Sequence, residues 1–213
     1  MNLWKSCAAV LVTIGLAGSS ALAENRLANP GFEDPITFDG PPFIGSWEGF
    51  SGGAGSAAGN SAVQPRSGAQ HLELLIANTN NTFAGAFQDV PSLIPGTEGI
   101  FSGWHMTPSN PLDIGVEVRI EWRNSVSNTE VGRTPNLTAH PTGQYSPFSL
   151  TAIVPAGADS ARVVYAIQSF GPEPTNNGTV YVDDTAFVPE PSMMLTTILG
   201  GLALVTARGR RRS

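Results

Sequence analysis

The sequence predicts an all-β fold, an antiparallel β-sandwich of the jelly-roll type, because short alternating segments follow one another between clusters of glycine, proline and asparagine. The clearest alternation runs from residue 112 to residue 122. Polar or glycine positions alternate there with one apolar row, which consists of Leu112, Ile114, Val116, Val118, Ile120 and Trp122. One face of this strand is therefore expected in the core and the other in water. Between the two terminal segments, no stretch keeps a convincing helical period.

Further strands are predicted on the same pattern on both sides of this segment. They cover residues 69–77, 82–90, 97–106, 144–154, 160–169 and 179–188. About eight to ten short strands in a region of this length favour a jelly roll over a seven-stranded immunoglobulin-like sandwich. The run from Gly52 to Gly55 is expected to be a flexible loop, because it lacks the following lysine and the helix of a phosphate-binding loop.

The N-terminal residues 1–23 have the three parts of a secretory signal peptide. Lys5 gives the positive start, residues 8–17 give the apolar stretch, and Ala21 and Ala23 form a small-x-small cleavage site before Glu24. The only cysteine, Cys7, lies inside this segment. The mature chain is therefore expected to have no disulfide, no thiol nucleophile and no thiolate metal site.

The C-terminal residues 189–213 form a second targeting segment. It opens with Pro189, Glu190 and Pro191, continues with an apolar run over 193–207, and ends with Arg208, Arg210, Arg211 and Arg212. The prolines favour an extended entry, the run predicts a short transmembrane helix, and the arginines are expected to stay cytoplasmic. An ordinary membrane anchor is the alternative, although the run is short for one that must span with about 20 residues.

These C-terminal residues resemble the bacterial PEP-CTERM sorting domain in order and spacing. The resemblance implies that the protein is exported through the inner membrane and processed at the membrane by an exosortase. It further implies a final place on the cell surface, in the outer membrane or in the extracellular matrix of a Gram-negative-type bacterium. Residues 24–188 are then the β-sandwich domain between two targeting segments.

Four short motifs in residues 24–188 resemble the galactose-binding-domain-like jelly roll of carbohydrate-binding modules. They are the opening residues 27–33, the Gly-Ser-Trp of 45–47, residues 66–72, and the closing residues 181–187 with two adjacent aspartates. The resemblance implies a structural calcium ion held by Glu33 and Asp183, and no catalytic role for that ion. Strand parity is expected to turn Asp183 away from the core and Asp184 towards it. In the alternative interpretation both carboxylates of the proposed ion site are ordinary, solvated strand-end groups.

Charge argues against a nucleic-acid partner. Without the two terminal segments, six basic residues, all arginine, oppose 16 acidic ones, for a net charge of about −10, which phosphate backbones repel. A neutral hydrated matrix such as extracellular polysaccharide suits this composition better. The candidate sugar platforms are Trp47, Trp104, Trp122 and Tyr145, of which Tyr145 is expected to be the most exposed and the three tryptophans are expected in the core. No ligand-binding residue is assigned from the sequence.

No catalytic constellation stands out, so the domain is expected to be non-enzymatic. His71, His105 and His140 lie in separate segments without metal-binding spacing. Glu117 and Glu121 share a strand face at about 13 Å by strand rise, which is too far for the paired carboxylates of a glycosidase. The prediction is an exported, carbohydrate-contacting matrix protein, and the alternative is a secreted glycan-acting hydrolase on the same sandwich.

Overall fold

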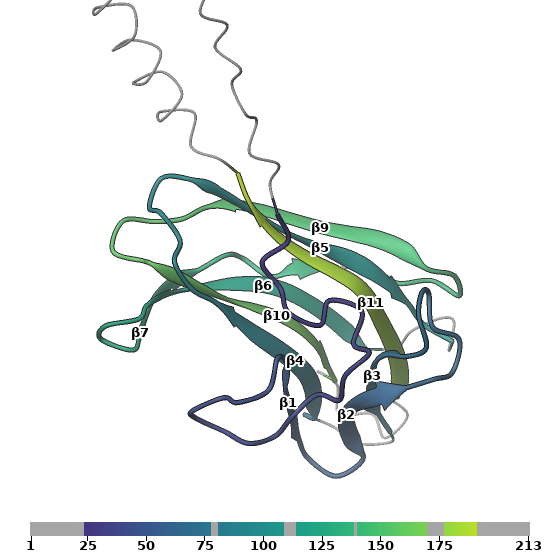
Figure 1. The fold of residues 1–213 in the computed structure, drawn as a ribbon. Helices are drawn as coiled ribbons and strands as arrows, with labels where there is room; N and C mark the ends of the chain where they lie inside the picture. The colour runs from purple at the N-terminus through teal and green to yellow at the C-terminus, as the bar shows by residue number, and fades with distance from the viewer. Residues whose placement is uncertain (1–23, 78–80, 109–113, 139, 170–176, 191–213) are drawn as a thin grey trace, which may run out of the picture.

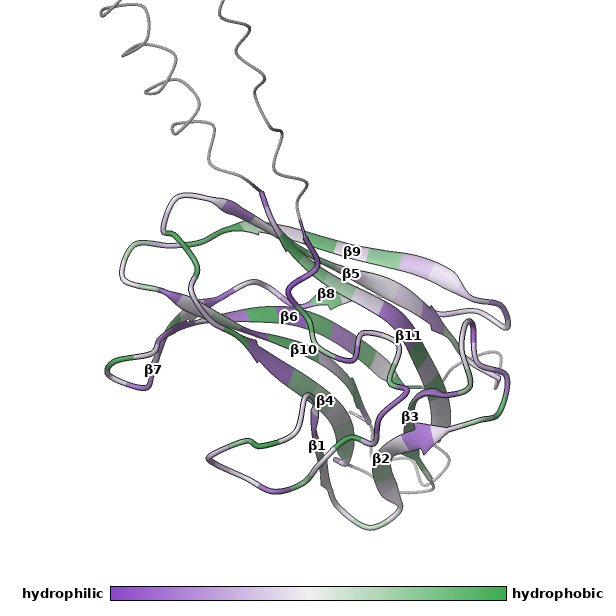
Figure 2. Ribbon diagram, in the orientation of Figure 1, coloured by the Kyte–Doolittle hydropathy of each residue, from purple (hydrophilic) through white to green (hydrophobic). Residues whose placement is uncertain are grey.

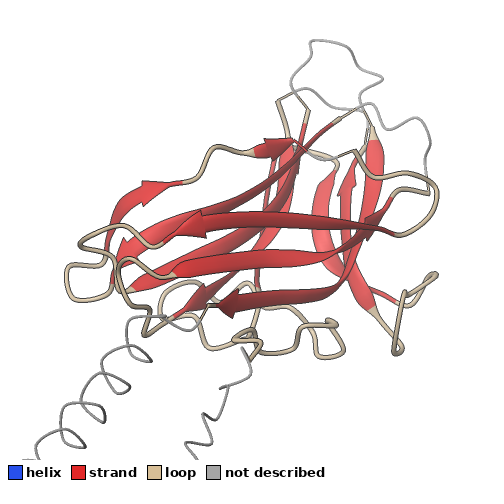
Figure 3. Ribbon diagram, turned by 90° about the horizontal axis from the view of Figure 1, so that it is seen from above, coloured by secondary structure: helices blue, strands red, loops and turns tan. Residues whose placement is uncertain are grey.

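The computed structural model describes residues 24–77, 81–108, 114–138, 140–169 and 177–190, and within these ranges every regular element is a strand (Figures 1 and 3). The strands are β1 (Glu48–Gly52), β2 (Ser56–Ser61), β3 (His71–Ile76), β4 (Phe83–Val90), β5 (Glu98–Met106), β6 (Gly115–Asn124), β7 (Thr129–Arg133), β8 (Leu137–Thr138), β9 (Ser146–Ile153), β10 (Ser160–Gln168) and β11 (Gly178–Pro189). The predicted all-β class is confirmed.

Two antiparallel sheets form the sandwich. Sheet A has the order β1-β4-β10-β6-β7, with β8 also paired to β6, and sheet B has the order β2-β3-β11-β5-β9. Figure 1 shows the two layers one above the other, with β9, β5 and β11 over β6 and β10. Chain neighbours often lie in different sheets, as a jelly roll requires.

The core lies between the inner faces of the two sheets and follows the alternation in the sequence. In β6, Val118 and Ile120 are completely buried and Trp122 is 4% exposed, while the polar residues between them face outward. The same alternation appears along β4, β6 and β10 as bands of opposite hydropathy (Figure 2). Trp47, 1% exposed, is also in the core, as expected for this residue and for Trp122. Leu112 lies outside the described residues.

The predicted strands correspond to β3, β4, β5, β6, β9, β10 and β11. The four strands that the sequence did not predict are the edge strands β1, β2 and β7 and the two-residue β8. β1 and β2 are rich in glycine or short polar residues, which have low β-propensity, and β8 has only two residues. Pairing with a neighbour in the sheet makes them extended. Of the expected glycine loop, residues 53–55 form the β1–β2 turn, in which Gly53 and Gly55 have positive φ angles of 91° and 81°, whereas Gly52 ends β1.

The N-terminal segment before β1 runs beside β11. The amide of Arg26 donates to the carbonyl of Phe187 at 2.8 Å, and the amide of Phe187 donates to the side chain of Asn25 at 2.9 Å. Residue 24 and residue 190 therefore leave the sandwich at the same place, along sheet B (Figure 1).

A buried polar pair joins the two sheets. His105 of β5 and Tyr165 of β10 both face the core, and the imidazole Nδ1 lies 2.7 Å from the phenol oxygen. Burial raises the pKa of Tyr165 well above its ordinary value and lowers the pKa of His105 to about 4. Both groups are therefore neutral at pH 7.

Candidate functional site

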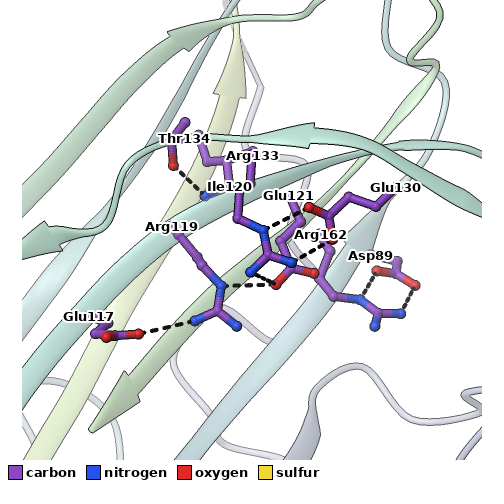
Figure 4. Close-up of polar contacts among 9 residues, drawn as sticks. All are labelled: Asp89, Glu117, Arg119, Ile120, Glu121, Glu130, Arg133, Thr134 and Arg162. Atoms are coloured by element: carbon purple, nitrogen blue, oxygen red, sulfur yellow. Dashed lines mark hydrogen bonds and ion pairs between the residues drawn. The ribbon is translucent and has the colours of Figure 1, made fainter. Parts of the chain in front are cut away.

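The outer face of sheet A has the features of a binding surface. Its β6 side carries Glu117, Arg119 and Glu121, the polar half of the alternating strand (Figure 4). Arg119 lies between the two carboxylates and bridges them, with Nε at 2.9 Å from Glu121 and Nη1 at 3.5 Å from Glu117. The two glutamates expected to be too far apart for glycosidase chemistry are thus joined through one guanidinium.

The ionic row continues onto β7. Arg133 donates two hydrogen bonds of 2.7 Å to the carboxylate of Glu130, and its Nη1 lies 3.9 Å from Glu121. The hydrogen bond from Arg133 lowers the pKa of Glu130. Every arginine in this row therefore has a carboxylate partner, as Figure 4 shows, and the side chains hold one another in place.

An aromatic surface occupies the β1–β4 side of the same face. The rings of Phe50, Phe83 and Phe87 form a row, with Phe50 in the middle at centroid distances of 6.1 Å and 6.2 Å from the other two. We call these three rings the phenylalanine platform. Phe83 is 41% exposed and the other two are half-buried.

Two glycines explain why the rings lie against the sheet. The register places Phe50 opposite Gly85 and Phe83 opposite Gly52. A Cβ atom at Gly85 would collide with the Phe50 ring, and one at Gly52 would collide with the Phe83 ring. Each ring therefore covers a glycine of the neighbouring strand, where no side chain is present. This leaves the opposite side of the ring available for contact.

Arg162 of β10 covers one part of this row. Its guanidinium carbon lies 3.8 Å from the centroid of the Phe87 ring, and its Nε and Nη2 donate to the carboxylate of Asp89 at 2.7 Å and 2.9 Å. Phe43 packs edge-on against Phe87 at 5.0 Å. Phe87 is thus covered by a cation and a second ring, which leaves Phe50 and Phe83 as the open rings of the platform.

A pocket of about 330 Å³ adjoins the platform at the Phe87 end. Its lining includes Phe43 and Phe87, the exposed Ile44, and the acidic residues Glu48 and Asp89. Apolar rings and a few polar groups around a concave space are typical of a small-ligand site.

A second cluster lies on the outer face of sheet B, where the residues predicted for calcium meet. The carboxylate of Glu33 accepts hydrogen bonds of 3.0 Å from the amide of Ala69. The carboxylate of Asp183 accepts from the amides of Arg66 and Ser67 at 2.9 Å and 3.1 Å. Glu33 and Asp183 thus bind the same loop, residues 66–70, although 150 positions separate them in the chain.

The parity prediction for Asp184 is wrong. A β-bulge between Asp183 and Ala186 breaks the alternation, and Asp184 takes a positive φ of 47°. Its carboxylate forms an ion pair with Arg66 and accepts a hydrogen bond of 2.7 Å from the hydroxyl of Ser67. Asp183 does point away from the core, but it is completely buried beneath the loop, and this burial raises its pKa.

Two aromatic residues of this cluster also differ from expectation. Trp104, predicted in the core, lies half-buried on the outer face, with the Arg66 guanidinium carbon 3.9 Å from its ring centroid. Tyr145, predicted to be exposed, is half-buried, and its hydroxyl donates to the carbonyl of Gln64 at 3.1 Å. Burial is the main cause that raises the pKa of Tyr145. Both rings therefore support the loop over 64–70 rather than offering a free platform.

The fit of this cluster to calcium is partial. In the part of the chain that the structure describes, no group of three or more His, Cys, Asp or Glu side chains is placed to hold a metal ion. Both oxygens of Asp183 accept amide hydrogen bonds, one of them from Asp184 at 2.7 Å. An ion shared by Glu33 and Asp183 would take its remaining ligands from backbone carbonyls and water, which calcium accepts.

Of the targeting residues, only Pro189 and Glu190 are described. Pro189 ends β11, and the amide of Glu190 donates to the carbonyl of Glu98 at 2.8 Å. The cleavage residues Ala21 and Ala23, Pro191, and the four terminal arginines lie outside the described residues. Within the described ranges, no helix is long and apolar enough to cross a membrane.

The phenylalanine platform was not found from the sequence. Its signal is the glycine that accompanies each ring along a strand, as in Phe83-Ala84-Gly85-Ala86-Phe87 and in Phe50-Ser51-Gly52. The tryptophans drew attention instead because of their size. The sequence alone could not show which phenylalanine lies opposite which glycine, because β1 was not predicted.

Comparison with known proteins shows the fold alone. No protein-family model matches the chain, and no curated protein sequence matches it. Among solved structures, TmCBM61 in complex with β-1,4-galactotriose superposes with a TM-score of 0.50 at 13% identity, over 79% of this chain and 100% of that one. A structure described as CBM4 superposes with a TM-score of 0.51 at 17% identity, over 77% and 99% of the two chains.

A larger protein contains a similar unit. The enzymatically active domain of tailspike protein 4 from bacteriophage CBA120 superposes with a TM-score of 0.60 at 15% identity. The match covers 78% of this chain but 21% of the tailspike chain, so this chain spans only part of that protein. The sandwich therefore has the jelly-roll fold of carbohydrate-binding modules.

Proposed function

We propose that the domain binds carbohydrate, without catalysing its cleavage, through the outer face of sheet A. The observation that carries the proposal is the phenylalanine platform, in which Phe50 and Phe83 lie against glycines of the neighbouring strand. Sugar rings present C–H groups that pack on aromatic faces, and their hydroxyls need polar partners at the edges. The jelly-roll fold shared with carbohydrate-binding modules supports the same conclusion.

The polar half of the face supplies these partners. Glu117, Glu121 and Asp89 are carboxylates on the same outer face, and each is oriented by an arginine. An oriented side chain loses little conformational entropy when a hydroxyl binds to it. A charged row beside an aromatic row can thus hold a sugar chain on two sides.

The non-enzymatic part of the proposal rests on the ion pairs. A glycosidase needs one carboxylate kept protonated as the acid and a second as base or nucleophile. On this face, Glu117 and Glu121 share Arg119, and Glu130 is held by Arg133 with a lowered pKa. The Arg133 hydrogen bond that lowers the pKa of Glu130 favours its anionic form, and Arg119 occupies the space between Glu117 and Glu121. Both arrangements support binding over proton transfer.

We propose further that the protein is exported and sorted to the cell surface or matrix through an exosortase, as the resemblance of residues 189–213 implies. The position of the described termini suits this role. Both lie along sheet B, whereas the platform lies on sheet A. A tether at either terminus leaves the platform accessible to polysaccharide.

A structural calcium ion at Glu33 and Asp183 is a separate part of the proposal. The two carboxylates meet at one loop, as a shared ion requires, and they connect the first and last segments of the sandwich to residues 66–70. Its role would be to stabilise the fold.

Binding to a panel of immobilised polysaccharides tests the main proposal. The panel includes xylan, β-1,4-galactan, mannan and acidic polymers, and we expect retention on at least one of them. Phe50→Ala and Phe83→Ala should each weaken that retention about tenfold or more, since an aromatic anchor accounts for about 2 kcal/mol. Ile153→Ala, an exposed residue on β9 of sheet B, is the matched control.

The same samples decide between binding and hydrolysis. Release of reducing ends from a bound polymer would make the domain an enzyme and contradict the non-enzymatic proposal. Binding that is lost in the Ile153→Ala control as much as in the platform variants would contradict the location. Retention on no polymer would contradict carbohydrate binding itself.

A further inference from the structure

We propose that the pocket beside Phe87 receives the terminal residue of a glycan chain, so that the protein recognises chain ends rather than chain interiors. This inference rests on the proposed carbohydrate-binding function and assigns a substrate class to the same face. It depends on how the pocket is closed.

The open rings of the platform lead to the pocket along β1. Phe50 and Glu48 both project from the outer face of β1, two positions apart, and Glu48 lines the pocket. The register pairs Glu48 with Phe87. A chain that lies on Phe83 and Phe50 and continues in this direction therefore reaches the pocket next.

Two segments line the pocket on the side that a continuing glycan chain would have to pass. The loop before β1 forms one wall, with Phe43, Ile44 and the backbone of Gly45. The N-terminal segment forms the other wall at Ala28. The amide of Ala28 donates to Gln88 Oε1 at 2.7 Å, and its carbonyl accepts from Gln88 Nε2 at 3.0 Å. These two bonds fix the segment across the end of β4.

The loop wall is also held in place. The carboxylate of Glu48 accepts hydrogen bonds from the hydroxyl of Thr37 at 3.1 Å and from the amide of Gly40 at 2.9 Å, and it is only 8% exposed. Phe43 packs on Phe87. The closed end is therefore a built part of the fold.

The size and charge of the pocket define its occupant. Its volume of about 330 Å³ is at the small end of ligand pockets, which suits a single terminal unit better than a continuing chain. The side chain of Asp89 is 42% exposed and can accept hydroxyl hydrogens, and the negative charges of Asp89 and Glu48 disfavour an acidic sugar. The occupant is a neutral, hydroxyl-rich terminal residue whose apolar side contacts Phe43.

Shortening the polysaccharide at constant mass tests the proposal. Xylan and β-1,4-galactan are immobilised intact and after partial acid hydrolysis, with equal mass and known numbers of chain ends. We expect the amount of protein bound at saturation to rise in proportion to the number of ends. An unchanged capacity on polymer that does bind would overturn the chain-end inference and leave carbohydrate binding intact, whereas no binding to either polymer or to the wider panel contradicts the proposed function.

Variants of the wall give a second readout. Phe43→Ala should weaken binding to the hydrolysed polymer by about tenfold, equivalent to about 1.4 kcal/mol, and reduce the dependence of capacity on chain ends. Phe38→Ala is the matched control, since Phe38 is an exposed phenylalanine of the same loop whose ring lies against Gly49 and does not line the pocket. Equal effects of the two substitutions would contradict the assignment of the pocket.

Discussion

Acidification should destabilise this protein well above the pH at which most carboxylates titrate, because two histidines are buried. His71 is completely buried and His105 is 3% exposed. Burial lowers the pKa of each from 6.5 to about 4. Among the residues that the structure describes, neither ring nitrogen of His71 has a hydrogen-bond partner, and its ring packs on Tyr181 at a centroid distance of 4.2 Å.

The sign and size of the effect follow from linkage. Between pH 6.5 and pH 4 the unfolded chain binds a proton at each histidine and the folded chain does not, so the free energy of unfolding falls as the pH falls. A pKa difference of about 2.5 corresponds to at most about 3.4 kcal/mol for each histidine. At pH 5 the loss is about 2 kcal/mol for each, because pH 5 lies between the pKa of the unfolded chain and that of the folded chain.

Urea denaturation at pH 7.5 and pH 5.0 measures this loss, and His71→Phe isolates one half of it. The phenyl ring keeps the contact with Tyr181. It also removes two unpaired polar atoms, so stability at pH 7.5 should be unchanged or higher. The loss between the two pH values should shrink by about 2 kcal/mol.

His140→Gln is the control for replacing a histidine that is exposed rather than buried. If His71→Phe loses as much stability on acidification as the wild type, then His71 takes up its proton in the folded state as readily as in the unfolded chain. The assignment of a buried, neutral His71 would then be refuted.

Three further predictions concern the other parts of the molecule. Gly52→Ala should displace the Phe83 ring and weaken polysaccharide binding with little change in melting temperature, whereas Gly59→Ala, which has open space around it, should change neither quantity. Calcium at a hundredfold excess over its Kd should stabilise the wild type by about 2.7 kcal/mol, and Glu33→Gln or Asp183→Asn should remove most of that gain; melting that ignores both calcium and EDTA would contradict the ion site. Intact mass of protein from native cells should show cleavage within 189–191, and a major species that keeps the C-terminal segment would contradict exosortase processing.

The sequence predicted the strands whose alternating apolar residues face the core. Strands such as β6 and β10 lie inside sheet A, and their inner faces carry continuous apolar rows such as Val116, Val118 and Ile120. A row of this kind has one favourable arrangement, with the apolar side in the core, so local pattern and tertiary position agree. The edge strands have no such row. Their extended form depends on hydrogen bonds to a neighbour, which no local pattern specifies.

The candidate sites, like the edge strands, depend on tertiary contacts that no local pattern specifies. Glu33 and Asp183 were found because their motifs stand at both ends of the domain, and the structure brings both to the loop over 66–70. The bulge that turns Asp184 from the core to Arg66 cannot be recognised in the apolar–polar alternation of the sequence. Strand parity is therefore reliable in the middle of a strand and fails where a functional or anchoring residue needs a different direction.

The phenylalanine platform shows why a binding face is harder to predict than a core. Inside the sandwich a large ring is stabilised by burial at almost any position, so Trp47 and Trp122 follow the expected rule. On the outer face the Phe50 ring lies against the neighbouring strand because the opposite residue, Gly85, has no side chain. That condition joins two strands that are 35 positions apart, so it belongs to the register of β1 and β4 rather than to either segment. Gly52 and Phe83 meet the same condition, and the nearest atoms to a Cβ at Gly52 all belong to the Phe83 ring. If the register is the cause, then filling this space should remove binding: in a Gly52→Ala background, polysaccharide retention should fall to the level of Phe83→Ala, and adding Phe83→Ala should lower it no further.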